Sequence, residues 1–336
     1  MPASTPAPMQ LLHMVTGYYV PQMLYVAASL GIADLLTSGP RSINDLAATT
    51  HTHAPSLVRL LRALASVEIF AENAQGYWQL TPLADGLRSD VPHSQRAWVQ
   101  LYGGIQQRAW QDLLYSIQTG QPAFPHVFGA SFYDYMASHP ADAALVDTAM
   151  DHSVDAWLAT IATSTTWDDV QTVMDIGGGH GALLAQLLTA HPHLEGMLFD
   201  LPHVVAGAAP LLERAGVLNR CRILGGDMFT TISTGSDVYM LSRVLLNWDD
   251  THCLAILRNC RQALGAQGRL LIIDAVAPEG ALASGTALWD VFLLVIFGAR
   301  VRRSADFEGL LRAADLQLLA LHTTPSQFSI LEAQPQ

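Results

Sequence analysis

The residues best suited to chemistry begin with a glycine run, Gly177-Gly-Gly-His-Gly181, which directly follows the apolar stretch Val173–Ile176. Glycines let the backbone turn sharply and approach a ligand, and the helix expected to begin at Gly181 offers unpaired N–H groups. The spacing Gly177-x-Gly179-x-x-Ala182 also satisfies the dinucleotide fingerprint. The run therefore predicts a nucleotide-type ligand and leaves its identity open.

Acidic residues around this run narrow the choice of ligand. Asp175 lies in the strand before the glycines, where its carboxylate can orient the loop. Asp200 ends the next expected strand, where it can hold a ribose hydroxyl, and Leu201 follows it. Asp227 ends a third strand and can accept from an adenine amino group, with the apolar Met228 and Phe229 to flank the ring. Their joint appearance in this order favours S-adenosylmethionine (SAM) over a dinucleotide.

The elements that must position these residues alternate regularly from Thr165 onward. Short apolar runs and amphipathic helices follow one another, which is typical of an α/β fold with a doubly wound parallel sheet. The expected strands are Val170–Ile176, Glu195–Asp200, Arg222–Leu224, Asp237–Leu241, Arg269–Asp274 and Phe328–Glu332. The expected helices are Gly181–Ala190, Val204–Ala215, Asp250–Leu264 and Ser304–Ala314.

The N-terminal half, residues 10–165, reads as mainly helical. We expect one helix over Met9–Leu36, a short helix capped by Ser42, and a third over Leu57–Ser66, followed by the strands Ile69–Ala71 and Gly76–Leu80. Three helices and a hairpin are the order of a winged helix. DNA binding is not expected, because the helix in the recognition position carries few arginines in an acidic chain.

Composition excludes several classes of function. The net charge is −12, from 17 basic and 29 acidic residues, which argues against binding to a phosphate backbone. Every basic residue other than histidine is arginine, so lysine chemistry is excluded within this chain. The cysteines form no CxxC pair, and no metal-ligand spacing is visible. No apolar run is long enough for a membrane span and no signal peptide is apparent, so we expect a cytoplasmic protein.

These motifs, with Leu241-Ser-Arg-Val-Leu-Leu-Asn-Trp-Asp-Asp250 and Gly268-Arg-Leu-Leu-Ile-Ile-Asp274, resemble the caffeate/hydroxyindole-type O-methyltransferases over essentially the whole chain. The resemblance implies a class I methyltransferase with SAM as cofactor and S-adenosylhomocysteine as product. It implies an N-terminal winged-helix dimerisation domain (1–100), linking helices that form a substrate lid (101–165) and a Rossmann-like SAM domain (166–336). The implied cofactor contacts are Gly177, Gly179, Asp200, Asp227, Met228, Phe229, Ser242 and Arg243.

The chain departs from this family where the catalytic base belongs. The family pattern Arg-Val-Leu-His-Asp-Trp is matched here by Arg243-Val-Leu-Leu-Asn-Trp248, which puts Leu246 at the position of the histidine that deprotonates the acceptor. Of the two acids that orient this histidine, one falls at Asp274 and the other is replaced by Val301. His152, on a helix that in this family borders the substrate, is the candidate substitute base.

The substrate side of the site is expected to be apolar and flat-walled, which suits an aromatic or polyketide-like molecule. The candidate lining residues are Phe128, Phe132, Leu246, Trp289, Asp290 and Leu293, with Asp290 as the polar anchor. Without a histidine base, the enzyme either methylates an oxygen by proximity and orientation, methylates a carbon or nitrogen, or uses SAM without methyl transfer. The apolar N-terminal helix predicts a homodimer.

Two readings outside this class stay open at this point. A SAM-sensing winged-helix regulator would bind DNA at low salt, and an NAD-dependent dehydrogenase would bind NAD and not SAM. The acidic charge argues against the first, and the acidic positions after the glycine run argue against the second.

Overall fold

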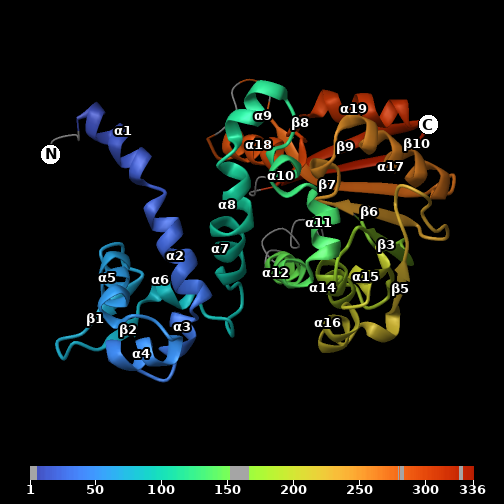
Figure 1. The fold of residues 1–336 in the computed structure, drawn as a ribbon. Helices are drawn as coiled ribbons and strands as arrows, with labels where there is room; N and C mark the ends of the chain where they lie inside the picture. The colour runs from blue at the N-terminus through green and yellow to red at the C-terminus, as the bar shows by residue number, and fades with distance from the viewer. Residues whose placement is uncertain (1–5, 152–165, 279, 281–283, 325–327) are drawn as a thin grey trace. The chain divides into compact units, whose positions relative to one another are not determined.

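The computed structural model describes residues 6–151, 166–278, 280, 284–324 and 328–336. Within these ranges the chain forms two compact units (Figure 1). The first consists of residues up to 108 together with 140–151, and the second of residues 109–139 together with 166 onward. No helix in the described ranges is both long and apolar enough to cross a membrane.

The first unit consists of helices and one small hairpin. Its elements are α1 (Ala7–Thr16), α2 (Tyr19–Ser29), α3 (Ile32–Leu35), α4 (Ile43–Thr50), α5 (Ala54–Ala65), β1 (Phe70–Glu72), β2 (Trp78–Leu80), α6 (Pro82–Asp85), α7 (Arg96–Gly103) and α12 (Pro140–Asp151). The predicted hairpin is present, with β1 and β2 antiparallel. Ser42 caps α4 as predicted, since its hydroxyl accepts from the backbone N–H of Asp45 at 3.1 Å.

The single helix predicted over Met9–Leu36 is wrong. The segment forms three helices, because Gly17 ends α1 and Gly31 adopts a left-handed conformation (φ +66°) before α3. A glycine tolerates this conformation without steric cost, so the apolar pattern continues across a break in the helix. The core of this unit lies around Leu46, Leu61 and Trp78.

The second unit is built on a mixed sheet with the strand order β5-β4-β3-β6-β7-β10-β9. Its strands are β3 (Thr172–Ile176), β4 (Glu195–Asp200), β5 (Cys221–Gly225), β6 (Val238–Ser242), β7 (Arg269–Ala277), β8 (Arg302–Arg303), β9 (Leu316–Thr323) and β10 (Phe328–Pro335). Strands β3 to β7 are parallel, whereas β10 is antiparallel to both β7 and β9. Strand β9 was not predicted, and the antiparallel direction of β10 corrects the all-parallel expectation.

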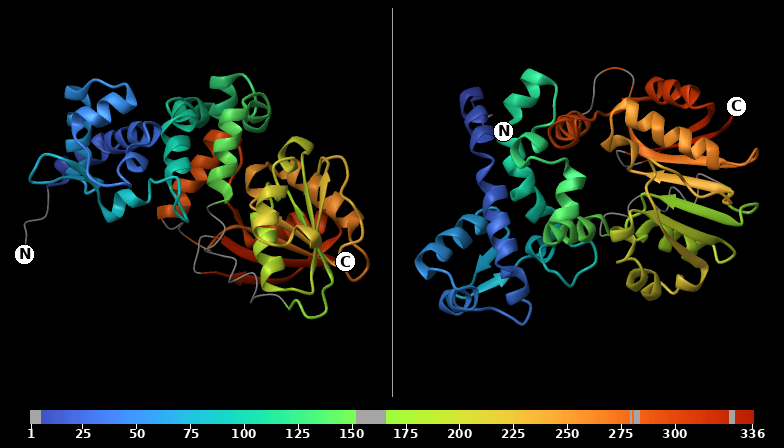
Figure 2. Two further views of the ribbon diagram at one scale, coloured as in Figure 1. Left: turned by 90° about the horizontal axis from the view of Figure 1, so that it is seen from below. Right: turned by 45° about the vertical axis from the view of Figure 1, so that its right-hand side comes forward.

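Helices cover both faces of this sheet (Figure 2). The helices of the second unit are α9 (Leu113–Thr119), α10 (Ala123–Phe128), α11 (Phe132–Ser138), α14 (Ala182–Ala190), α15 (Pro202–Val205), α16 (Ala209–Arg214), α17 (Asp250–Ala263), α18 (Ser284–Phe297) and α19 (Ser304–Ala313), with short 3-10 turns η1 (Leu218–Arg220) and η2 (Leu245–Asn247). Helix α8 (Ile105–Trp110) passes from the first unit into the second. Helices α14 and α16 pack on one face, and α17 and α19 on the other.

The helix predicted over Val204–Ala215 is also wrong in extent, because the chain forms α15 and α16 with a break at Gly207. A side chain at Gly207 would collide with the ring of His180, since an added Cβ would lie 2.6 Å from its Nε2. The other predicted strands and helices agree with the structure within a few residues at their ends, whereas α18 and β8 were not predicted. The strand order reverses between β3 and β6, and in sheets of this type the ligand crevice opens at the carboxyl ends of those strands.

Candidate active site

The loop after β3 has the shape that the glycine run predicts. Gly177 and Gly179 both have positive φ, +68° and +59°. A Cβ at Gly177 would lie 2.9 Å from a methyl group of Val244, whereas a Cβ at Gly179 would meet no heavy atom within 4 Å. The backbone at Gly179 therefore faces open space, and a ligand can approach it closely.

Asp200 ties this loop to the end of β4. Its carboxylate accepts from the backbone N–H of Gly179 at 2.8 Å and from that of Leu201 at 2.7 Å. Burial raises the pKa of Asp200, while the two backbone donors act in the opposite direction. The carboxylate thus stands at the glycine loop, where the sequence predicts a ribose contact.

The turn after β5 carries the predicted adenine contacts. The Asp227 carboxylate accepts from the backbone N–H of Phe229 at 2.9 Å and from the hydroxyl of Thr230 at 3.2 Å, so it also stabilises its own turn. Met228 is half-buried, and its carbonyl accepts from Asn259. The ring of Phe229 meets Trp248 edge to face at 4.7 Å. These side chains form an apolar shelf beside an exposed acid.

Strand β6 ends at Ser242, and Arg243 follows with the positive φ of +56°, unusual for a residue with a side chain. Its backbone N–H donates to the carbonyl of Ile273 at 2.8 Å. Burial lowers the pKa of Arg243 to about 10, and the nearby Asp175 and Tyr133 oppose that shift. The guanidinium is a cation held inside the site, close to a buried acid.

Asp175 is the acid in question, and it is 1% exposed. Neither of its carboxylate oxygens has a hydrogen-bond partner within the described residues. Burial raises its pKa to about 7, with a further contribution from Asp200 and an opposing one from Arg243. A buried carboxylate without a donor is costly unless a partner is supplied.

The residues around the glycine loop suit SAM. The open backbone at Gly179, the unpartnered acid Asp175 and the carboxylate of Asp200 suit a ligand that combines a cationic amino-acid end with a ribose. SAM has both groups, whereas the pyrophosphate of a dinucleotide would bring negative charge towards two carboxylates. The residues present therefore fit SAM.

The titration of Asp175 leads to a prediction for the ligand-free protein. Its pKa is near 7 in the folded state and about 3.9 when unfolded, so between these values the unfolded state releases a proton that the folded state keeps. The contribution of Asp175 to stability therefore falls as pH rises from about 4 to about 7. Asp175→Asn removes this titration, and we expect its free energy of unfolding relative to the unsubstituted protein to rise by roughly 2–4 kcal/mol between about pH 4 and pH 8.

Urea unfolding of both proteins at several pH values measures this difference. Asp237→Asn is the control. Burial acts to raise the pKa of Asp237, but the hydrogen bonds from Gln171 and Thr172 together outweigh it and lower that pKa, so the pH dependence should have the opposite sign. A constant difference between Asp175→Asn and the unsubstituted protein would mean that Asp175 titrates normally.

The predicted base position lies on η2, where Leu246 is 4% exposed. Its backbone N–H donates to the Asp274 carboxylate at 3.0 Å, and the other oxygen of Asp274 accepts from Ala275 at 2.7 Å. Burial raises the pKa of Asp274 to about 7. Asp274 was predicted to orient a catalytic histidine. It instead accepts a hydrogen bond from the backbone of Leu246, which stands where that histidine would be.

Val301, which stands at the position predicted for the second acid, also makes a backbone hydrogen bond to a carboxylate. The N–H of Val301 donates to the Asp290 carboxylate, on α18, at 2.7 Å. Asp290 was predicted to anchor the substrate, and one of its two oxygens is engaged in this link. His152, the candidate substitute base, lies outside the described residues.

The predicted substrate-lining residues gather on α10, α11 and α18 of the second unit. Phe128 stacks near Phe124 at 4.5 Å, Phe132 meets Phe297 at 5.1 Å, and Trp289 stacks on Phe292 at 4.7 Å. Leu293 is fully buried, which is the environment of a core residue. The aromatic residues belong to connected clusters, as an apolar wall requires.

Arg302 was not predicted to act near the site, whereas Tyr133 is one of the aromatic residues expected in the substrate lid. Arg302 is almost fully buried and bonds to the carbonyls of Leu245 and Trp248, and Tyr133 is hydrogen-bonded to Asn247. The hydrogen bond between Tyr133 and Asn247, which occupies the family's aspartate position, was not predicted.

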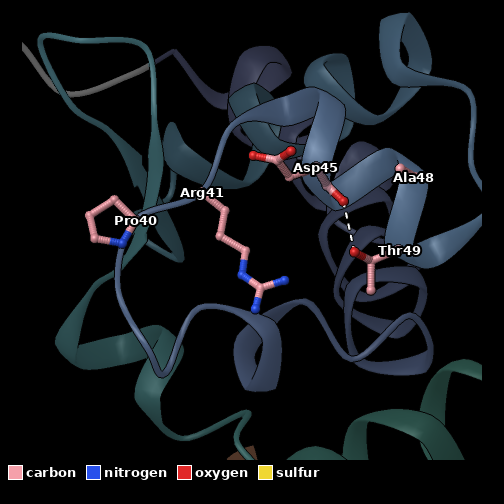
Figure 3. A pocket seen from close by; sticks show the side chains of 5 residues that line it. All are labelled: Pro40, Arg41, Asp45, Ala48 and Thr49. Atoms are coloured by element: carbon pink, nitrogen blue, oxygen red, sulfur yellow. Dashed lines mark hydrogen bonds between the residues drawn. The ribbon is translucent and has the colours of Figure 1, made fainter.

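The first unit contains a separate hollow of about 380 Å³, lined by Pro40, Arg41, Asp45, Ala48 and Thr49 (Figure 3). The hydroxyl of Thr49 donates to the carbonyl of Asp45 at 2.8 Å. None of these residues belongs to the predicted site. Over the described ranges there is also no group of three histidine, cysteine or acidic side chains able to hold a metal ion.

A glycine loop at the β3–α14 junction, acids after β4 and β5, and a sheet that reverses order at β3 and β6 define a class I SAM-dependent methyltransferase. Comparison with known proteins gives the family. Residues 110–317 match the model of the O-methyltransferase domain, and residues 12–90 match the O-methyltransferase dimerisation domain. The chain belongs to the O-methyltransferase family, and its cofactor is SAM.

Similar proteins include Phenazine O-methyltransferase PhzM of Lysobacter antibioticus, which is 42% identical over 325 residues, 97% of this chain and 95% of that protein. The crystal structure of LaPhzM superposes with a TM-score of 0.95 at 42% identity, over 99% of this chain and 100% of the other. The NcsB1 O-methyltransferase of neocarzinostatin biosynthesis, solved with SAM and 2-hydroxy-5-methyl naphthoic acid, has a TM-score of 0.83 at 35% identity, over 94% and 96% of the two chains.

Proposed function

We propose that this enzyme methylates a hydroxyl oxygen of a small aromatic secondary metabolite, and that it does so by positioning the acceptor without a histidine base. The observation that carries the second part is the buried Leu246 beside the Asp274 carboxylate, because a side chain that cannot accept a proton stands where that acid could orient a base. The aromatic substrate is supported by the clusters on α10, α11 and α18 and by the phenazine and naphthoate relatives.

Bound SAM supplies a methyl group on a positively charged sulfur. We propose that Gly177, Gly179 and Asp175 hold its amino-acid part together with Ser242 and Arg243, that Asp200 and Leu201 hold the ribose, and that Asp227, Met228 and Phe229 hold the adenine. Leu246, with Phe128, Phe132, Trp289, Asp290 and Leu293, would then border the acceptor. Leucine at position 246 excludes water from the acceptor oxygen and leaves catalysis to proximity and orientation.

We also propose that residues 1–100 form a winged-helix dimerisation domain, 101–165 a substrate lid and 166–336 the SAM domain. A homodimer is supported by the matching dimerisation domain and by the exposed apolar side chains of α1 and α2, among them Leu11, Met14 and Tyr19. The free cysteines Cys221, Cys253 and Cys260 suit the reducing cytoplasm, and the charge of −12 is unfavourable for nucleic acid binding.

Methylation of carbon or nitrogen, or a reaction without methyl transfer, gains no support from the relatives described above, which are named for O-methylation. Incubation of the protein with methyl-labelled SAM and a panel of hydroxyphenazines, hydroxynaphthoates and simple phenols tests the proposal. We expect label on a hydroxyl oxygen of at least one bicyclic or tricyclic acceptor, identified by mass spectrometry and NMR. Label only on carbon or nitrogen, or no transfer across the panel, would contradict it.

A further inference from the structure

The amide of Asn247 fixes the hydrogen-bonding direction of a tyrosine in the site. Its side-chain nitrogen lies 3.0 Å from the carbonyl oxygen of Arg243 and 2.8 Å from the hydroxyl oxygen of Tyr133. A carbonyl oxygen only accepts, so the atom facing Arg243 must be the NH₂ group. Its two hydrogens then serve both contacts, and Tyr133 accepts from Asn247.

It follows that the proton of the Tyr133 hydroxyl points elsewhere. In the described ranges this proton has no acceptor, and the carbonyl oxygen of Asn247 has no donor. The uncharged pair of Tyr133 and Asn247 therefore keeps one donor, the phenol O–H, and one acceptor, the amide oxygen, for a ligand. A substrate hydroxyl or its anion is the kind of group that can use them.

Tyr133 stands beside the groups predicted to hold SAM. It lies on α11, with its ring stacked near Trp248 at 5.3 Å and near Phe297 at 5.9 Å. Tyr133 is 36% exposed. Partial desolvation raises the pKa of its hydroxyl above the ordinary value of about 10, Asp200 adds to this shift, and Asn247 and Arg243 oppose it. The hydroxyl therefore stays protonated at physiological pH, and it can donate a hydrogen bond but cannot act as a base.

The charges that face this hydroxyl come from two strands of the sheet. Asp200 is the last residue of β4, and its carboxylate accepts from two backbone N–H groups. Arg243 comes directly after β6 and is the cation near the phenol. An anion beside Tyr133 would receive a hydrogen bond from the phenol and an attraction from Arg243, which opposes the repulsion from Asp200, and neutral Asn247 adds no repulsion. The aspartate of the family pattern at this position would repel it.

We propose that Tyr133 donates a hydrogen bond to the acceptor oxygen in its ionised form, with Asn247 as the residue that positions Tyr133, and that the preferred substrates are acidic aromatic hydroxyls. Such hydroxyls are conjugated to a carbonyl, a quinone or a ring nitrogen. This inference rests on the proposed function, because it takes an oxygen as the methyl acceptor and names the class of that acceptor.

The reaction balances without a proton acceptor on the protein. The acidic hydroxyl loses its proton to solvent before or on binding. A lone pair of the resulting anion forms the bond to the methyl carbon, and the carbon–sulfur bond breaks with its electron pair left on sulfur. The positive charge of the sulfonium and the negative charge of the acceptor disappear together, so both reacting groups end neutral.

A chromophoric probe tests binding apart from catalysis. With S-adenosylhomocysteine present, 4-nitrophenol, which ionises near neutral pH, is titrated with protein and its ionisation followed by visible absorbance. We expect the pKa of the bound probe to lie roughly 1–2 units below that of the free probe, as a hydrogen bond to a charged acceptor implies. Tyr133→Phe should lose about one unit of this shift, and Tyr115→Phe, on α9, should retain all of it.

Asn247→Asp is the second variant. A carboxylate has no N–H, so Tyr133 would turn its proton towards residue 247, and the new charge would repel the probe anion. We expect its affinity for the ionised probe to fall roughly tenfold to a hundredfold while circular dichroism shows an unchanged fold. Unaltered probe pKa in Tyr133→Phe, unaltered affinity in Asn247→Asp, or absence of probe binding at millimolar concentration would overturn the inference.

Turnover separates this inference from the proposed function. With 4-nitro-1-naphthol and 1-naphthol as acceptors of similar shape, kcat/KM should favour the acidic one, and Tyr133→Phe should reduce its methylation roughly tenfold or more. Equal methylation of both, unaffected by Tyr133→Phe, would leave the function standing and overturn the inference. A Tyr133-dependent probe shift with no methylation of any acceptor would support the binding role and overturn the function.

Discussion

Replacement of Arg302 by methionine is expected to destabilise the protein by about 3 kcal/mol and to reduce methyl transfer severely. Arg302 is 1% exposed and donates to the carbonyls of Leu245 at 2.9 Å and Trp248 at 2.7 Å. It also bonds to the Asp250 carboxylate at 2.9 Å. One guanidinium thus holds both ends of the η2 turn, which carries Leu246 and Asn247.

The size of this effect follows from what methionine cannot supply. A buried carbonyl that loses its donor costs about 1–3 kcal/mol, and Cys253, a weak donor to the same two carbonyls, compensates only in part. Asp250 is half exposed and can return to water, so its release costs less. The sum is large because three contacts are lost from a single fully buried side chain.

Urea unfolding and steady-state kinetics measure the two consequences. Arg302→Lys keeps the charge but cannot form three hydrogen bonds in the plane of a guanidinium, so we expect an intermediate loss of stability. Arg258→Met, on the exposed side of α17, is the matched control and should change stability by less than about 0.5 kcal/mol. If Arg302→Met lies within about 1 kcal/mol of the unsubstituted protein, the guanidinium does not hold the turn.

The strands that position the cofactor could be predicted because their signals are local. A short apolar run that ends in glycine or aspartate predicts both a buried strand and the residue at its carboxyl end, and Asp200 and Gly225 end β4 and β5 accordingly. The glycine loop is equally local, since positive φ at Gly177 and Gly179 is a property of the residue type.

The errors lie where tertiary packing decides. Gly17 and Gly31 interrupt an apolar pattern that by itself predicts one helix. Strand β9 alternates buried and exposed residues at the sheet edge, yet its sequence, Leu-Gln-Leu-Leu-Ala-Leu-His-Thr, fits a helix almost as well. The direction of β10 depends on β9 as its neighbour, so the missed strand also concealed the antiparallel pairing.

The interactions around the base position could not be predicted, because they join distant parts of the chain. Tyr133 and Asn247 are separated by 114 positions, and Arg302 and Leu245 by 57. A sequence pattern indicates which residue types are missing, as with the absent histidine. It does not indicate that the backbone of Leu246 takes over the carboxylate of Asp274.

The largest gain in activity is expected from Leu246→His with a weakly acidic phenol as acceptor. Such a phenol, with a pKa of about 10, is almost entirely protonated at neutral pH, and a positioned imidazole accelerates its reaction roughly 10²- to 10⁴-fold. The Asp274 carboxylate already lies 3.0 Å from the backbone N–H of residue 246, and its oxygens have lone pairs left for an imidazole N–H. We expect kcat/KM for 1-naphthol to rise about a hundredfold.

The pH dependence of this gain identifies its cause. Leu246→His should acquire an ascending limb in kcat/KM near the imidazole pKa of about 6.5, which the unsubstituted protein lacks. Leu246→Phe gives a flat ring with no basic nitrogen and should show neither the gain nor the limb. Leu246→His combined with Asp274→Asn should lose most of the gain, because the imidazole is then no longer oriented by a carboxylate.

The same variant connects the missing base to the choice of substrate. An acidic acceptor reaches the site already ionised, so an added base has no proton to remove and its rate should hardly change. The preference for 4-nitro-1-naphthol over 1-naphthol should therefore shrink by the factor that 1-naphthol gains. If Leu246→His methylates 1-naphthol no faster than Leu246→Phe does, residue 246 does not face the acceptor oxygen, and the base position must be sought elsewhere. If Leu246→His accelerates methylation of both acceptors equally, the imidazole does not act by removing the hydroxyl proton. The preference for acidic hydroxyls would then not be caused by Leu246.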